Sequence, residues 1–181
     1  MPTEGSLLPE TYHFQLGETR AQLLARMKKA MDEALAEAWT GRDESLLLAN
    51  PHELLTLASL VERETGLTQE RPHVACVFFN RLKKGMRLQS DPTTIYDLSG
   101  GVGVLDRPLI KADLERATPH NTYVIDRLPP GPIANPGRAS LMAVAHPLTC
   151  EDLYFVADGT GGHAFSKSLE SHNENVGNWR K

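Results

Sequence analysis

Apolar residues recur at helical intervals over the first half of the chain and predict three helices there. The first follows Thr19, which stands three residues before a glutamine in the spacing of a capping box, and extends to about Trp39. The second begins after Asn50, a capping residue followed by a proline, and extends to Thr65. The third covers about residues 70–84. The first half of the chain is therefore expected to be rich in helix.

From Met86 onward the pattern breaks into short elements, and eight prolines punctuate the rest of the chain. Residues 128–137 are too rich in proline for regular structure and predict a stiff loop. Residues 111–116 and 139–145 predict short helices, and residues 122–125 predict a strand. Residues 153–157 and 163–165 predict the two strands of a β-hairpin, and a last helix is expected after its cap, Ser168. Helices first and short strands later, without regular βαβ alternation, indicate an α+β fold.

The composition is that of an ordinary globular protein and narrows the classes of partner. The 181 residues suit one domain, or one domain with a small appendage. The formal net charge is -4 and no basic stripe is present, which excludes nucleic acid as the expected partner. The chain also has no run of about 18 apolar residues and no signal-peptide pattern at its start.

Cysteine and histidine spacing predicts no cofactor site. Cys76 and Cys150 stand far apart and outside any CxxC pair, so we expect two buried apolar side chains, with a disulfide as the open alternative. The seven histidines form no HExxH motif and no paired spacing. We therefore expect neither a metal ion nor another cofactor.

Two carboxylates near the end of the second predicted helix are the first candidates for chemistry. A helical wheel of about 100° per residue places Glu62 and Glu64 on opposite shoulders of an apolar face, each roughly 80° from its centre. Arg63 points away from that face, toward solvent. A carboxyl group beside apolar residues has a raised pKa, which suits a general acid. The wheel does not choose between the two glutamates, and an ordinary pair of boundary residues is the alternative.

Seven short motifs, in the same order along the chain, resemble those of the endolytic murein transglycosylases, the YceG-like family. The resemblance covers nearly all of the chain from Gly5, and the motifs lie at residues 57–65, 77–82, 86–93, 121–123, 128–133, 154–165 and 171–173. It implies cleavage of the β-1,4 bond between N-acetylmuramic acid and N-acetylglucosamine within peptidoglycan strands, with a 1,6-anhydro ring left on the muramyl product. It also implies that Glu64, the second glutamate of Val-Glu-x-Glu, is the single acid and base, with Glu62 as a supporting neighbour.

Polar residues in the same motifs are candidates for contacts with the glycan: Arg81, Gln89, Asp91, Asn121, Tyr123, Asn135 and His163. Four of them have an ordinary structural alternative. Asp91 suits the capping position before Pro92, Tyr123 suits the core, His163 suits a satisfied structural histidine, and Arg81 suits an ion pair with Glu62.

The resemblance also implies a domain organisation and a cellular setting. Residues 17–181 would form the catalytic domain, and residues 1–16 would be the remnant of a junction with a preceding LysM-like domain. The chain would be a soluble part of a protein anchored in the cytoplasmic membrane, with its catalytic domain facing the periplasm or cell wall. Its partners would be peptidoglycan glycan strands and the synthases that polymerise them, and its activity would serve cell-wall assembly and glycan-strand termination.

Two other functions remain open from the residues. A hydrolytic muramidase would use Asp91 as a second carboxylate beside Glu64. A glycan-binding module without turnover would use the same polar residues and leave the glycan intact.

Overall fold

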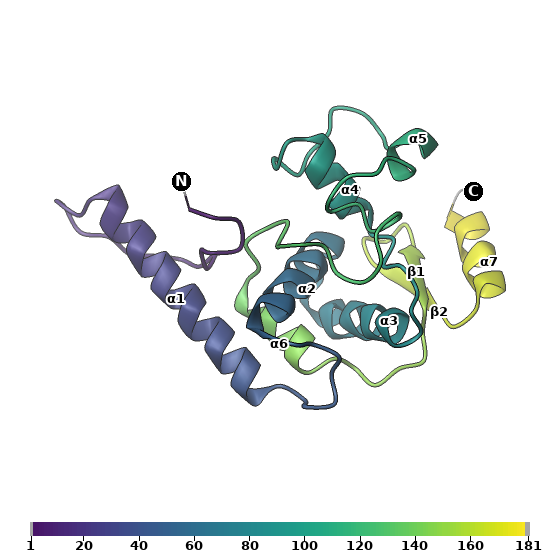
Figure 1. The fold of residues 1–181 in the computed structure, drawn as a ribbon, viewed down its shortest axis with the longest axis horizontal. Helices are drawn as coiled ribbons and strands as arrows, with labels where there is room; N and C mark the ends of the chain where they lie inside the picture. Colours follow the sequence, from purple (N-terminus) through teal and green to yellow (C-terminus); the bar gives the residue numbers. More distant parts are fainter. Residues whose placement is uncertain (1, 180–181) are drawn as a thin grey trace.

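The computed structural model describes residues 2–179, and within them the chain folds into helices and one small antiparallel sheet (Figure 1). This confirms the predicted α+β fold. The helices are α1 (Arg20–Gly41), α2 (Pro51–Glu64), α3 (Arg71–Lys83), α4 (Asp91–Leu98), α5 (Lys111–Leu114), α6 (Arg138–Ala145) and α7 (Leu169–Trp179), with a 3₁₀ turn, η1 (Thr68–Glu70), before α3. The strands are β1 (Tyr154–Ala157) and β2 (His163–Ser166).

Local hydrogen bonds set the starts of the long helices where the sequence predicts them. The hydroxyl of Thr19 accepts a hydrogen bond from the backbone N–H of Gln22 at 3.3 Å, and the side chain of Gln22 accepts from the backbone N–H of Thr19 at 2.8 Å. The side chain of Asn50 accepts from the backbone N–H of Glu53 at 3.0 Å. Both caps satisfy N–H groups that the first turn of a helix leaves without partners.

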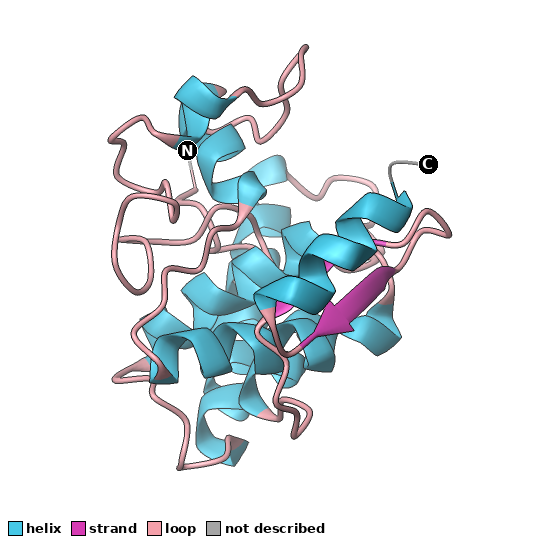
Figure 2. Cartoon of the chain, turned by 90° about the vertical axis from the view of Figure 1, so that its right-hand side faces the viewer, coloured by secondary structure: helices cyan, strands magenta, loops and turns pink. Residues whose placement is uncertain are grey.

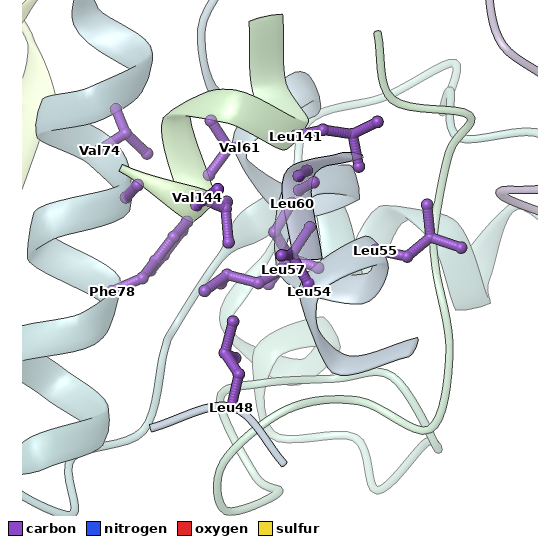
Figure 3. Packing of buried hydrophobic residues seen from close by; sticks show 14 of the residues in the cluster. Leu48, Leu54, Leu55, Leu57, Leu60, Val61, Val74, Phe78, Leu141 and Val144 are labelled. Carbon is purple, nitrogen blue, oxygen red and sulfur yellow. The ribbon is translucent and has the colours of Figure 1, made fainter. Parts of the chain in front are cut away.

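The core is built around α2, which is buried on every side and not on one face alone. All eight residues of the run 54–61 are buried, two of them polar. The hydroxyl of Ser59 donates to the carbonyl of Thr56 and accepts from the backbone N–H of Ile133 in the proline-rich loop. Helices α1, α3 and α6 pack around α2, and Figure 3 shows Leu57, Leu60 and Val61 gathered with Val144 of α6 and Phe78 of α3. The end of α2 is therefore held rigidly.

The predicted strand at residues 122–125 is wrong, because this segment forms a turn. The backbone N–H groups of Val124 and Ile125 both donate to the carbonyl of Asn121, at 3.0 and 3.1 Å. The side chain of Thr122 accepts from the backbone N–H of Ser90. Side-chain bonds to α4 and its entry thus override the β-propensity of this run.

The predicted hairpin is confirmed, and it lies at one side of the body together with α7 (Figure 2). Tyr154 pairs with Ser166 and Ala157 pairs with His163 across the two strands. Ser168 accepts from the backbone N–H of Ser171 at 3.2 Å and starts α7 as predicted. The short helices predicted at 111–116 and 139–145 correspond to α5 and α6.

The expectation of two separate buried cysteines is wrong, since Cys76 and Cys150 form a disulfide. The bond joins α3 to the segment between α6 and β1, two regions 74 residues apart in the sequence. Spacing alone could not predict that these regions meet. The amide of Asn80 reinforces the junction by donating to the carbonyls of Cys150 and Asp152, each at 3.0 Å.

The predicted junction segment, residues 1–16, and the predicted catalytic domain, residues 17–181, stay predictions. Residues 5–16 contain no regular helix or strand, and nothing in the structure tests a domain boundary at residue 16. The predicted domains also include residues 1, 180 and 181, which lie outside the described residues. Across residues 2–179 every helix is too short or too polar to cross a membrane.

Candidate active site

Glu64 is the last residue of α2, and its part-buried side chain meets the entry to α4. The hydroxyl of Ser90 donates a hydrogen bond to Oε1 of Glu64. Burial raises the pKa of Glu64 to about 7, and the negative charge of Asp91 adds to that rise. The Ser90 hydroxyl and the charges of His163 and Arg81 act in the opposite direction, and burial outweighs them. Near neutral pH this carboxyl group therefore exists in both protonation states, as a group that gives and takes a proton must.

A buried network of hydroxyl groups holds Ser90 in place. The backbone N–H of Ser90 donates to Oγ1 of Thr122 at 2.9 Å, and Oγ1 of Thr93 donates to the carbonyl of Ser90 at 2.6 Å. The residue before it, Gln89, has a φ of 50°, a left-handed backbone that residues other than glycine adopt rarely. Ser90 occupies the N-cap position of α4, yet its side chain makes no capping bond and donates instead to Glu64.

Asp91 and Tyr123, two of the predicted glycan contacts, lie together beside this network. The phenol of Tyr123 donates to Oδ1 of Asp91 at 2.5 Å, and Asp91 is otherwise exposed. Burial and the bond to Asp91 raise the pKa of Tyr123, so the phenol keeps its proton. The alternative that Asp91 is the helix cap is wrong, since Asp91 is the first residue of α4 and Ser90 precedes it as the cap.

Arg81 is a buried cation that organises the segment leading to Gln89. Its Nε donates to the carbonyl of Leu153 at 2.6 Å, and its Nη1 donates to the carbonyl of Leu88 at 2.9 Å and to Oε1 of Gln89 at 3.2 Å. Burial lowers the pKa of Arg81. The alternative that Arg81 pairs with Glu62 is wrong, because its donors face the 87–89 and 153 backbone. Gln89 itself has an exposed side chain.

Glu62 faces away from Glu64 and ties three helices together. Its carboxylate accepts from Nη2 of Arg71 at 3.1 Å, from the backbone N–H of Gly137 at 3.0 Å and from Oγ of Ser140 at 2.7 Å. These bonds join α2 to α3 and to the start of α6, which agrees with a supporting role. Arg63 is exposed as predicted, and its guanidinium also donates to the carbonyl of Gly103.

The two predicted asparagines are engaged in structural bonds. Asn121 is fully buried, and its amide donates to the carbonyls of Leu114 and Arg116 while its oxygen accepts from Thr94 and from the backbone N–H of Tyr123. It therefore supports the turn that carries Tyr123. Asn135 accepts from the backbone N–H of Leu7 at 3.0 Å, and that bond fastens the N-terminal segment to the proline-rich loop.

His163, at the start of β2, is fixed by Glu70 from the turn that follows α2. The backbone N–H and the Nδ1 of His163 each lie 2.9 Å from a carboxylate oxygen of Glu70. The same carboxylate accepts from the hydroxyl of Thr65, the residue next to Glu64. The hydrogen bonds from His163 and Thr65 outweigh burial and lower the pKa of Glu70, so this group is ionised at neutral pH.

One cluster of potential metal ligands occurs within residues 2–179, and it does not suit a metal ion. His73, Cys150 and Asp152 bring their donor atoms within 4.8 Å of one another. The sulfur of Cys150 is bonded to Cys76 and offers no thiolate, and Nε2 of His73 lies 2.8 Å from Asp152. The cluster is a junction of one hydrogen bond and one disulfide beside the hairpin.

Sequence reasoning missed two residues of this site, Ser90 and Glu70. Ser90 lies inside the motif at residues 86–93, so the sequence could have marked it as a candidate. Its contact with Glu64 could not be predicted from the sequence. Glu70 has no signal in the sequence beyond its place at the start of a helix. Both roles depend on contacts between segments that are 26 and 93 residues apart.

Comparison with known proteins gives consistent matches over almost the whole chain. A model of the YceG-like family matches residues 1–178. A protein of Bacillus subtilis (strain 168) named endolytic murein transglycosylase is 39% identical over 173 residues, which are 96% of this chain and 47% of that protein. A protein of the same name from Streptococcus pneumoniae (strain D39) is 34% identical over 177 residues, which are 96% of this chain and 31% of that protein.

A solved structure agrees with these matches. The crystal structure of a yceG-like protein from Listeria monocytogenes superposes with a TM-score of 0.80 at 39% identity, covering 94% of this chain and 54% of that one. The chain thus spans about half, or less, of the length of each of these relatives.

Proposed function

The chain belongs to the YceG-like family, and from that premise we propose that it is the catalytic part of an endolytic murein transglycosylase. Two relatives that match 96% of the chain carry this name. The observation that carries the proposal is the pKa of Glu64, raised to about 7 by burial at the end of α2. A carboxyl group with such a pKa can be a proton donor and then a proton acceptor in one turnover at neutral pH.

The proposed reaction uses Glu64 twice and consumes no water. Protonated Glu64 donates its proton to the glycosidic oxygen as the bond from C1 of the muramyl sugar to that oxygen breaks through an oxocarbenium-like state. The resulting carboxylate then removes the proton of the muramyl C6 hydroxyl, whose oxygen forms a bond to C1 and closes the 1,6-anhydro ring. The leaving sugar has gained one proton and Glu64 is protonated again. The bond from C1 to the glycosidic oxygen has been replaced by the bond from C1 to the C6 oxygen.

The surroundings of Glu64 suit this single-carboxyl chemistry. Ser90 fixes Oε1, so the second oxygen, Oε2, is the one we assign to the proton transfers. The negative charge of Asp91 raises the pKa of Glu64 and keeps the acid form available. Because Asp91 accepts the phenol hydrogen bond of Tyr123, we assign it to pKa control and sugar contacts and not to the activation of water.

The predicted contacts with the glycan divide into two groups. We propose that Gln89, Asp91, Tyr123 and His163 touch the sugars, since their side chains lie in the segments that meet around Glu64. Arg81 and Asn121 act behind them by holding Gln89 and Tyr123. Asn135 bonds to Leu7, so we assign it no sugar contact.

The setting of the activity follows from the same proposal. The longer protein would be anchored in the cytoplasmic membrane, with this domain facing the periplasm or cell wall. It would cut glycan strands during wall assembly and meet the synthases that make them. Fractionation of cells and crosslinking of the full-length protein would test both points.

Product analysis tests the chemistry directly. Purified glycan strands are incubated with the chain in ¹⁸O-labelled water, and the products are analysed by mass spectrometry. We expect 1,6-anhydromuramyl ends without label. Reducing muramyl ends that carry ¹⁸O would show a hydrolytic muramidase, and binding without cleavage at any pH would show a glycan-binding module.

Matched variants make the role of Glu64 specific. Glu64→Gln should abolish the release of anhydro products while glycan binding persists. Glu33→Gln, which changes an exposed glutamate on α1 that pairs with Lys29, should cleave as the unmodified chain does. Full activity in Glu64→Gln would disprove the proposed mechanism.

A further inference from the structure

Glu70 joins the two segments that flank the working carboxyl group. Its carboxylate binds the hydroxyl of Thr65 immediately after Glu64, and it also binds the backbone N–H and the ring of His163 at the start of β2. The side chains of Glu70 and His163 are 16% and 14% exposed, so this pair is largely shielded from solvent. Shielded charge-assisted hydrogen bonds of this kind have a defined geometry.

The protonation state of Glu70 determines which ring nitrogen of His163 carries hydrogen. Glu70 is ionised at neutral pH and can only accept hydrogen bonds. Nδ1 of His163, at 2.9 Å from Oε2 of Glu70, must therefore be the donor. In the neutral ring Nε2 is then an acceptor.

Nε2 of His163 has no hydrogen-bond partner within residues 2–179. It is also absent from the fully buried atoms that lack a partner, so it is open to a ligand. The ring also packs against Phe155 in a T-shaped contact, with centroids 5.4 Å apart. A positive charge on the His163 ring would lower the pKa of Glu64, which places the ring, in either protonation state, within electrostatic reach of the working carboxyl group. An acceptor held in that position suits the hydroxyl and acetamido N–H donors of an amino sugar.

Glu70 can approach the start of β2 this closely because residue 162 is a glycine and has no side chain. A Cβ at Gly162 would lie 2.7 Å from Oε1 of Glu70, the oxygen that accepts the backbone N–H of His163. Any larger residue would displace the carboxylate. The arrangement thus requires a glutamate, a glycine and a histidine from two distant segments.

We propose that Glu70 is a positioning residue that holds His163 with hydrogen on Nδ1, so that Nε2 accepts a hydrogen bond from the N-acetylated sugar bound at Glu64. This inference rests on the proposed function for its substrate class. It adds a residue that acts through His163, and it assigns His163 one tautomer and one acceptor atom.

Nitrogen NMR of the histidine rings tests the tautomer without any need for turnover. The full chain is labelled with ¹⁵N, and the signals of His163 are assigned by comparison with His163→Asn. We expect the Nδ1–H form in the unmodified chain and a shift of the Nε2 resonance on addition of a peptidoglycan tetrasaccharide to the Glu64→Gln variant. An Nε2–H ring, or an Nε2 resonance that saturating tetrasaccharide leaves unchanged, would overturn the proposal.

Glu70→Gln tests the positioning role with minimal change of shape. The backbone N–H of His163 can only donate, so the amide oxygen of the new side chain will face it. The NH₂ group of that side chain will then face Nδ1. That donor reverses the preference of the ring and moves the hydrogen to Nε2. We expect the Nε2–H signature and a loss of kcat/KM on the order of 10- to 100-fold, as when a carboxylate that orients a histidine is replaced. Retention of the original tautomer or of full kcat/KM would refute the role.

Two further variants separate the ring nitrogens. His163→Asn keeps an N–H near the position of Nδ1 and lacks Nε2, so we expect a folded protein with the same loss of kcat/KM. Full activity in that variant would reduce His163 to a brace and overturn the proposal. Glu53→Gln, which changes a carboxylate that caps α2 at Ala49, serves as the control. If the unmodified chain makes no anhydro products, the proposed function fails, and the two NMR experiments still decide the role of Glu70.

Discussion

Replacing Ser90 by alanine should move the pH dependence of cleavage toward higher pH. The hydroxyl of Ser90 donates to Oε1 of Glu64 and stabilises the ionised form of that carboxyl group, so it lowers the pKa of Glu64. Without it, burial and the charge of Asp91 act with less opposition. The pKa of Glu64 should therefore rise above its value of about 7.

The size of the shift follows from the strength of one hydrogen bond to a charged group. Such a bond contributes about 1.5 kcal/mol or somewhat more, and about 1.4 kcal/mol corresponds to one pKa unit. The pKa of Glu64 should thus rise by roughly one unit. Since protonated Glu64 is the proposed reacting form, activity should be lost as pH rises through this pKa, and the alkaline limb of the profile should move by the same amount.

Ser90→Ala suits this experiment because its structural cost is small. Ser90 is the N-cap residue of α4, but its side chain makes no capping bond that the substitution would remove. The backbone bonds of Ser90 to Thr122 and Thr93 do not involve its hydroxyl and should persist. A change in the pH profile can therefore be separated from a change in folding by a melting curve at each pH.

The assay is kcat/KM for release of anhydromuramyl products between pH 5 and pH 9. We expect a lower maximum, because Glu64 loses an orienting contact, together with an alkaline limb displaced by about one pH unit. Ser45→Ala, at an exposed position between α1 and α2 and outside the seven motifs, is the control and should keep the original profile. An alkaline limb that stays in place, or moves to lower pH, would refute the assignment of Ser90 as the residue that tunes Glu64.

Three predictions concern stability. Burial raises the pKa of Glu64 from 4.5 to about 7, so the stability of the native state falls as pH rises from the lower to the higher of these values. Glu64→Gln removes this ionisation and should stabilise the protein by up to roughly 3 kcal/mol at pH 8 but not at pH 4, as measured by urea unfolding. Reduction of the Cys76–Cys150 bond should lower the free energy of unfolding by about 2–5 kcal/mol, and an unchanged melting temperature would contradict this. Leu57→Ala should cost about 2–5 kcal/mol in the same urea assay, whereas Leu16→Ala at an exposed site should cost almost nothing.

The helices and hairpin could be predicted because their signals are local. Thr19 and Asn50 cap helices through bonds to residues three positions away, and the turn before His163 is rich in glycine. The strand predicted at 122–125 failed because Thr122 bonds to Ser90, a residue far away in the sequence. The disulfide could be stated only as an open alternative for the same reason: nothing near Cys76 in the sequence indicates that Cys150 lies beside it.

For the candidate site, sequence reasoning proposed the central carboxyl group and missed the residues that support it. The helical wheel found Glu62 and Glu64 but could not rank them, and only the resemblance to a family selected Glu64. The structure separates the two by their partners, because Glu62 is occupied by Arg71, Gly137 and Ser140. The wheel also failed to show that α2 is buried on every side, because that depends on helices α1, α3 and α6 arriving from other parts of the chain.

Three local departures from ordinary stability meet at Glu64. The carboxyl group is removed from water far enough to raise its pKa, Gln89 has a left-handed backbone, and the start of α4 has no side-chain cap from Ser90. Each of these lowers stability, by about 1 kcal/mol or more for a missing cap or a strained residue. Sequences that fold well avoid such conflicts except where function requires them. Their convergence on one carboxyl group is a physical reason, independent of any relative, to place the chemistry at Glu64.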